Sequence, residues 1–129
     1  MDDSILKKSG ANFYGYENID SRGEMHYNLN VIRGSGDLVL NNRGVFFKEW
    51  ITKNEYSIYL DKITKVEISS KHNKKMQWPG KVLRIYYRDK DEIKIFGIAL
   101  GGKFSITKGW KDDAYVWKEK IELLLKEKF

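Results

Sequence analysis

A hairpin pattern near the middle of the chain constrains the fold more than any other feature. Apolar and polar residues alternate on both sides of a polar connection at residues 41–44, Asn-Asn-Arg-Gly. Leu38 and Leu40 precede this connection, and Val45 and Phe47 follow it. Because Asn and Gly tolerate the positive φ that tight turns require, the segment predicts a β-hairpin. A hairpin of this kind fixes the register of an antiparallel sheet.

The same alternation recurs along much of the chain. It is typical of half-buried antiparallel strands, and it occurs, with interruptions, in residues 25–31, 56–60, 63–68, 83–87 and 93–100. In the last segment the apolar phase changes at Gly97, which predicts a β-bulge at this residue. Residues 33–37 are expected to form the turn that leads into the hairpin.

The pattern changes period after residue 112. Apolar residues then recur at spacings of three and four, as on one face of a helix; they are Ala114, Trp117, Ile121, Leu124, Leu125 and Phe129. Asp112 or Asp113 can cap the helix N-terminus, and Lys126 and Lys128 suit the negative end of its dipole. We therefore predict a mainly β fold, a curved antiparallel barrel of about seven strands whose open end is capped by a C-terminal α-helix.

The order of the elements separates this prediction from another common small barrel. An OB-fold carries its helix between its third and fourth strands, whereas the only strong helical pattern here is C-terminal. A chain of 129 residues is long enough for one core without disulfides. We expect residues 1–11 to form a flexible tail and residues 12–129 to form a single domain, with Phe13, Tyr14 and Tyr16 folding back over one edge.

The hairpin and the strands after it resemble the pleckstrin-homology-like (PH-like) superfold in its GRAM and bacterial versions. The residues that carry the resemblance are Gly36, Leu38, Leu40, Asn42, Gly44, Phe46, Ile58, Leu60, Ile63 and Val66, and the similarity covers about residues 24–128. The resemblance implies a binding module rather than an enzyme, with phosphoinositides, peptides or partner domains as ligands. In lipid-binding members basic residues hold the phosphates between the first two strands. Here that loop keeps only Arg33, near Asp37, which argues against phosphoinositide recognition.

Residues that catalyse reactions or bind metals are scarce in the sequence. Cys is absent, and the two His residues, His26 and His72, have no obvious carboxylate partner or metal-ligand spacing. Residues 34–36, Gly-Ser-Gly, are expected to form a β-turn because no helix follows them to build a phosphate site. The acidic residues around Lys90 are expected to form a solvated turn. We predict no catalytic, cofactor-binding or metal-binding residues, no cofactor and no small-molecule substrate.

Lysines concentrate in one loop, residues 71–81. The net charge of +6 permits attraction to phosphates or anionic membranes, although lysine-rich surfaces also serve solubility alone. We expect the charges of this loop to keep it out of the core. The predicted contact residues for a membrane or a partner are Lys71, Lys74, Lys75, Met76, Trp78 and Lys81, together with Arg33. An exposed Trp flanked by lysines is typical of an interfacial membrane anchor, and the alternative is that Trp78 folds onto the barrel.

Three functional hypotheses follow from these patterns. The first is a protein-binding or self-associating module that acts through an exposed edge or a groove beside the helix. The second is peripheral binding to an anionic membrane through residues 71–81. The third and least favoured is nucleic-acid binding, since Arg84, Tyr86 and Arg88 share one strand face but aromatic cross-strand pairs also stabilise any sheet. No signal-peptide pattern or long apolar stretch occurs, which predicts a cytoplasmic location, with attachment to the membrane surface as the alternative.

Overall fold

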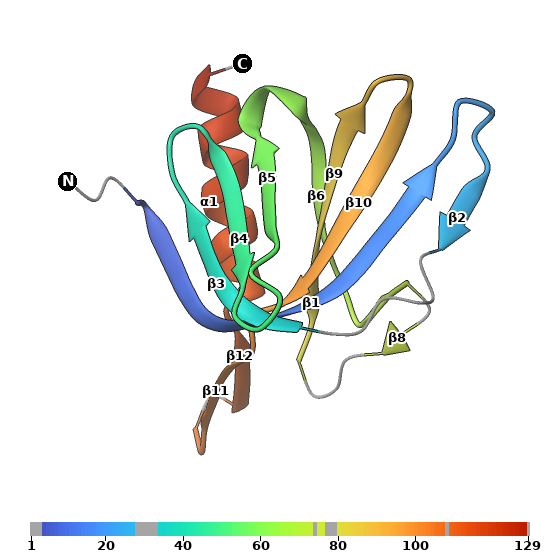
Figure 1. Ribbon diagram of the computed structural model, residues 1–129. Helices are drawn as coiled ribbons and strands as arrows, with labels where there is room; N and C mark the ends of the chain where they lie inside the picture. Colours follow the sequence, from blue (N-terminus) through green and yellow to red (C-terminus); the bar gives the residue numbers. More distant parts are fainter. Residues whose placement is uncertain (1–3, 28–33, 74, 77–79, 108, 129) are drawn as a thin grey trace.

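The structure, a computed structural model, describes residues 4–27, 34–73, 75–76, 80–107 and 109–128. Its main element is one strongly curved antiparallel sheet, with helix α1 (Ala114–Lys128) packed against it (Figure 1). The strand order is β5-β4-β3-β1-β10-β9-β6, and β2 pairs with β1 beside this path. The sheet does not close, so β5 and β6 are its edges. The predicted mainly β fold with one C-terminal helix is confirmed, and it is compatible with a PH-like fold.

The large sheet contains most of the strands, which are β1 (Leu6–Ile19), β2 (Met25–Tyr27), β3 (Gly34–Leu40), β4 (Gly44–Glu49), β5 (Glu55–Tyr59), β6 (Ile63–Ser69), β9 (Val82–Asp89) and β10 (Glu92–Ala99). Two small hairpins lie outside it, β7 (Lys71–His72) with β8 (Lys75–Met76), and β11 (Gly102–Ser105) with β12 (Gly109–Asp112). A 3₁₀ turn, η1 (Leu60–Lys62), joins β5 to β6. In the described part of the chain, no helix has the length and apolar character needed to cross a bilayer.

The predicted hairpin is confirmed as the pair β3 and β4. Its four alternating core residues pair with one another across the two strands and are buried. The side chain of Asn41 closes the turn, because its Oδ1 accepts a hydrogen bond of 2.8 Å from the backbone N–H of Arg43. The Asn41 N–H donates in turn to the carbonyl of Gly44 at 3.0 Å. The turn therefore satisfies its own backbone groups and fixes the register.

Strand β1 corrects the prediction for the N-terminus. Residues 1–11 are predicted to form a tail, but the sheet begins at Leu6, which pairs with Leu40 of β3. Phe13, Tyr14 and Tyr16 do not cover an edge; they lie in this strand, which runs through the middle of the sheet between β3 and β10.

Two irregularities explain why the alternation of β1 is hidden in the sequence. The register shifts between Ser9 and Ala11 against β3, and again between Phe13 and Gly15 against β10. Gly10 and Gly15 have φ values of 83° and 88°, a region in which glycine is favoured. Each bulge changes which face the following side chains occupy, so no period-two pattern spans the strand.

The apolar core lies on the concave face of the sheet. Rings from five strands meet there, and the centroid of Phe13 lies 4.9 Å from that of Phe96 and 4.7 Å from that of Tyr56. Helix α1 packs against this core through β6, β9 and η1. Its buried residues are Ala114, Trp117, Ile121 and Leu124, and Trp117 is 3% exposed.

The predicted start of the helix is confirmed. Asp112 caps it, since its Oδ1 accepts a 2.9 Å hydrogen bond from the Ala114 N–H. At the other end Lys128 donates to the carbonyl of Asn42 at 2.7 Å. Phe129, predicted as the last residue of the apolar stripe, lies outside the described residues.

Three local predictions are wrong. Residues 34–37 are not a turn but the start of β3, and Gly36 is required there because a Cβ would overlap the Lys48 carbonyl. The pairing of β10 with β9 continues through Gly97, so the bulge lies on the facing strand β1 instead. Of the half-buried strand predicted at residues 25–31, only β2 lies within the described residues, and its side chains are exposed.

Candidate functional site

Arg84 is the centre of a buried polar cluster on the sheet face opposite to the apolar core, called here the outer face. Its neighbours along β9, Leu83 and Ile85, point into the core, so the Arg84 side chain points outward. It is nevertheless only 8% exposed. The two terminal nitrogens donate to the two carboxylate oxygens of Glu17 at 2.9 and 3.1 Å, and Nε donates to Glu67 at 2.7 Å. We call the outer polar cluster the set Glu17, Glu67, His72, Asn73, Arg84 and Tyr86.

The cluster holds residues 71–73 against the sheet. The His72 ring is fully buried, its Nε2 lies 2.7 Å from the carbonyl of Gly15, and its Nδ1 lies 2.9 Å from Nη1 of Arg84. Because a guanidinium can only donate, Nδ1 accepts and the ring proton is on Nε2, which makes the imidazole neutral. The backbone N–H of Asn73 donates to the carboxylate of Glu17 at 2.7 Å. The Glu17 carboxylate therefore binds both Arg84 and the segment of residues 71–73 that covers it.

A glycine in the sheet makes room for the imidazole. Gly97 of β10 lies between Gly15 and Arg84 in the two flanking strands. A Cβ at Gly97 would overlap the His72 ring. The residues next to this position are buried apolar side chains of the outer face, Tyr14, Val82 and Ala99. The phase change seen in the sequence of β10 thus arises because both faces of this strand are covered.

The charges of the cluster are stable at neutral pH. Burial raises the pKa of the Glu17 carboxyl, but hydrogen bonds from Arg84 and Asn73 outweigh this and hold the pKa below its usual range. The pKa of Glu67 is also lowered, because bonds from Arg84 and Tyr86 outweigh its partial burial. The pKa of Arg84 is raised despite burial, chiefly by its bond to Glu17. General acid–base catalysis needs a group that titrates near the working pH, and these ion-paired groups are held away from it.

Three predictions about this region are wrong. The charges of residues 71–81 predict a loop outside the core, but the side chains of His72 and Asn73 are fully buried. The sequence also predicts no carboxylate near His72, whereas Nδ1 lies 3.7 Å from the Glu17 carboxylate. In addition, Arg84 does not join Tyr86 in an exposed basic row, because its guanidinium is bonded to two glutamates.

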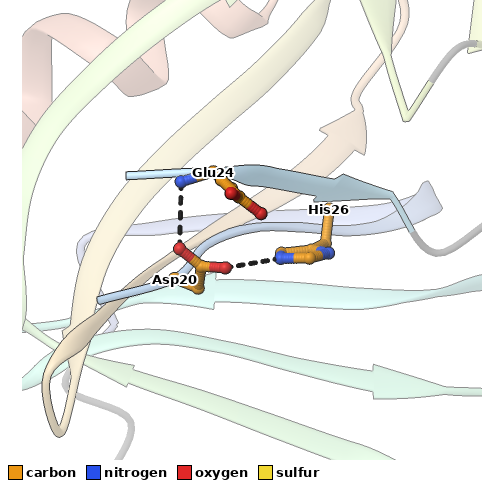
Figure 2. A group of neighbouring side chains, drawn as sticks. All are labelled: Asp20, Glu24 and His26. Carbon is orange, nitrogen blue, oxygen red and sulfur yellow. Dashed lines mark hydrogen bonds and ion pairs between the residues drawn. The ribbon is translucent and has the colours of Figure 1, made fainter. Parts of the chain in front are cut away.

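A second polar group closes the turn between β1 and β2. Figure 2 shows Asp20, Glu24 and His26, with a 2.7 Å contact between Asp20 Oδ2 and His26 Nε2. Oδ1 of Asp20 accepts 2.9 Å hydrogen bonds from the backbone N–H groups of Arg22 and Glu24. These bonds, led by that of His26, lower the pKa of Asp20. The prediction that His26 lacks a carboxylate partner is therefore wrong.

The same three side chains have the donor types of a metal site. Ligand atoms from Asp20, Glu24 and His26 lie within 4.8 Å of one another. Carboxylate and imidazole together suit first-row divalent metals. Glu24 and His26 are exposed, however, and Asp20 is half-buried, and the hydrogen bonds of the group already account for its arrangement as the closure of a turn.

The predicted membrane or partner contact residues are only partly described. Lys71 is exposed on β7, and the backbone N–H of Lys81 donates to Asp112 at 2.6 Å. The backbones of Lys75 and Met76 form β8. Arg33, Lys74 and Trp78 lie outside the described residues, so the joint contact surface remains a prediction.

The edge strand β5 has a backbone partner on one side only. In the sheet it pairs with β4, and its other side faces no strand among the described residues. Two hydrogen bonds fix the phase of this ladder. The N–H of Glu49 donates to the carbonyl of Asn54 at 2.9 Å, and the N–H of Leu60 donates to the carbonyl of Arg43 at 2.9 Å.

This phase determines which backbone groups of β5 are free. The register between the two bonds is continuous, and hydrogen-bonded pairs alternate with non-hydrogen-bonded pairs in an antiparallel ladder. Tyr56 and Ile58 therefore direct their N–H and C=O groups toward β4. Glu55, Ser57 and Tyr59 direct theirs away from it, to the edge. No described residue hydrogen-bonds to these outward groups.

Two shallow hollows flank the edge. The first has a volume of about 400 Å³ and is lined by Asp37, Val39, Phe46, Phe47, Lys48, Glu55, Tyr56 and Ser57. The second, of about 430 Å³, lies at the other end of the strand and is lined by Asn42, Arg43, Tyr59, Leu60, Asp61, Lys62 and Lys128. The hollow at the start of the strand contains two carboxylates and Lys48, and the hollow at its end contains three basic residues and Asp61.

Comparison with known proteins assigns neither a family nor a function to the chain. No family model matches the chain, and no curated protein matches it.

Proposed function

We propose that the chain is a non-enzymatic, PH-like protein-binding module that receives a strand from its partner at β5. The observation that carries the proposal is the row of outward backbone groups on Glu55, Ser57 and Tyr59. No residue in the described part of the chain forms a hydrogen bond to them. Addition of an extended segment to a sheet edge is a common mode of protein recognition, in which backbone bonds give affinity and alternate side chains give specificity.

The composition of β5 supports this role. Sheet edges that must stay unpaired are usually protected by Lys, Pro or a bulge. Residues 55–59, Glu-Tyr-Ser-Ile-Tyr, contain no Lys or Pro and only one charged residue, Glu55 at the start, and the ladder with β4 is regular. Tyr59 is 51% exposed and lies edge-to-face on Phe46 at 5.9 Å, which gives an added strand an aromatic surface to contact.

The polar groups of the protein support binding rather than catalysis. In the outer polar cluster the charges of Glu17 and Arg84 neutralise each other in a buried site. In the turn after β1, Asp20 is occupied by His26 and by two backbone N–H groups. Neither arrangement presents an activated nucleophile or a general base to a substrate.

A displayed library of extended peptides tests the proposal. Peptides selected on the immobilised wild-type protein are measured again on two variants, Ser57→Pro and Ser57→Ala. Proline removes the outward N–H without affecting the bonds to β4, whereas alanine keeps it. We expect the selected peptides to bind the wild type and Ser57→Ala but not Ser57→Pro. Selection of no peptide, or equal binding to Ser57→Pro, would contradict the proposal.

Peripheral binding to an anionic membrane is the second candidate. It is supported by two isoleucines at loop positions, Ile51 and Ile106, which are 94% and 95% exposed. The lysines of residues 71–81 supply the charge that such a surface attracts.

Co-sedimentation with vesicles tests this candidate. We expect the wild type to bind vesicles containing phosphatidylserine at low salt and to lose binding when Lys74 and Lys75 are both replaced by Glu. Ile106→Ser should weaken binding with less dependence on salt, because its contribution comes from burial rather than charge. A wild type that fails to sediment with these vesicles at low salt rules the candidate out.

A further inference from the structure

We infer that the strand received at β5 is the β5 strand of a second copy of this chain, in an antiparallel arrangement with two-fold symmetry centred on Ser57. The inference rests on the proposed function, since it names the partner of the same edge. Symmetric pairs of identical surfaces are the commonest form of soluble assembly.

The backbone phase of β5 makes the edge complementary to itself. The outward groups belong to Glu55, Ser57 and Tyr59, which are placed symmetrically about the central residue. In the two-fold arrangement Ser57 faces Ser57 of the second copy, and Glu55 faces Tyr59 of the second copy. Each facing pair is then of the hydrogen-bonded type, so every outward N–H and C=O on both strands finds a partner. A shift by two residues leaves outward groups at the ends unpaired.

The side chains also fit this register. Ser57, at the two-fold axis, is small and exposed, so two copies can face each other without a clash. Tyr56 faces Ile58 of the second copy in a non-hydrogen-bonded pair. Ile58 is 1% exposed in its own copy, so this pair adds little new side-chain contact. Tyr56 is already held in place, because its hydroxyl donates to the Glu49 carboxylate at 2.9 Å.

The charges favour the antiparallel orientation over a parallel one. Asp37 and Glu55 outnumber Lys48 by the start of β5, and Arg43, Lys62 and Lys128 outnumber Asp61 by its end. The antiparallel pair places the acidic start of each strand beside the basic end of the other. Glu55 also forms an ion pair with Lys48 at 3.6 Å, and both side chains are more than half exposed. An exposed ion pair of this kind is weak, so it does not remove the attraction between the two copies.

The interface is small, so the dimer is expected to depend on concentration. One strand edge buries less surface than a standard protein–protein interface. Association should therefore be detected as a monomer–dimer equilibrium rather than as a permanent dimer.

Sedimentation equilibrium over a range of concentrations tests the inference. The wild type and Ser57→Ala should form dimers, and Ser57→Pro should weaken the dimer by about tenfold or more, because it removes two symmetric hydrogen bonds and places a ring at the axis. Unchanged circular dichroism and thermal unfolding of Ser57→Pro confirm that the monomer is intact. Glu55→Lys should also weaken the dimer, and adding Arg43→Glu should restore part of it.

Each outcome separates this inference from the proposed function. A wild type that stays monomeric at the highest concentration overturns the inference; if it still selects edge-dependent peptides, β5 binds other proteins instead. If it selects none, both proposals fail. A Ser57→Pro variant that dimerises like the wild type overturns the inference, because association then uses another surface.

Discussion

The two edge strands of the sheet, β6 and β5, have different surroundings. Beside β6, helix α1 packs against the sheet, and the outer polar cluster holds residues 71–73 on the neighbouring strands. Beside β5, the described chain leaves a row of backbone groups without partners. One side thus concentrates contacts that stabilise the monomer, and the other keeps backbone groups to which no described residue forms a hydrogen bond. Changes at the first side should affect stability, and changes at the second should affect association.

The largest expected effect is at the helix that covers the β6 side. Trp117 is 3% exposed in the core, so Trp117→Ala leaves a cavity. We expect a loss of roughly 3–5 kcal/mol in the free energy of unfolding, measured by chemical denaturation. Tyr115→Ala, on the exposed face of the same helix, is the control and should change little. A loss below about 1 kcal/mol for Trp117→Ala would mean that α1 does not seal the core.

The next effect is at the centre of the outer polar cluster. Arg84→Met leaves the carboxylate of Glu17 buried without its ion pair, which costs about 3–5 kcal/mol for a fully buried group. We expect about 3 kcal/mol, because Glu67 is one-third exposed and water can replace its bond. Adding Glu17→Gln to Arg84→Met should recover part of the loss in urea unfolding. Equal stability of Arg84→Met and the wild type would show that the cluster does not stabilise this side.

A smaller effect is expected at the glycine beneath the imidazole. Gly97→Ala forces the added methyl group into the His72 ring, and overpacking of this kind costs about 1–3 kcal/mol. Adding His72→Ala removes the ring, so the cost of the double variant should be less than the sum of the two single costs. Additive costs in thermal unfolding would mean that the ring and Gly97 do not touch.

The pH dependence gives a weaker but independent test. The pKa values of Glu17 and Glu67 are lower in the folded protein than in ordinary glutamates. The folded state therefore binds these protons less readily, and its extra stability is full above the usual glutamate pKa of about 4.3 and is lost as pH falls through the folded pKa values. Glu17→Gln should show a shallower loss between neutral and acidic pH than the wild type. An equal loss of stability with falling pH in the two proteins would show that Glu17 does not contribute to the pH dependence.

The apolar side of this comparison was largely predictable from the sequence. Leu38, Leu40 and Trp117 follow simple periods because each packs on one continuous apolar face. The strand β1 was missed because the bulges at Gly10 and next to Gly15 break its period.

The outer polar cluster could not be predicted in the same way. Glu17, His72 and Arg84 are far apart in the chain, and polar residues carry no periodic sign of burial. The phase change at Gly97 was the one local signal, since it marks a strand that is covered on both faces. The free edge was missed as a specific site because the direction of each backbone group depends on the observed ladder between β4 and β5.

Residue-resolved hydrogen exchange on dilute protein tests most directly whether the β5 edge is free. The amides of Tyr56 and Ile58 bond to β4 and should be protected, whereas those of Glu55, Ser57 and Tyr59 should exchange much faster. Raising the protein concentration should slow exchange at these three outward amides and leave Tyr56 and Ile58 unchanged. Equal protection of all five amides in dilute solution would show that another part of the chain covers the edge and would contradict the account.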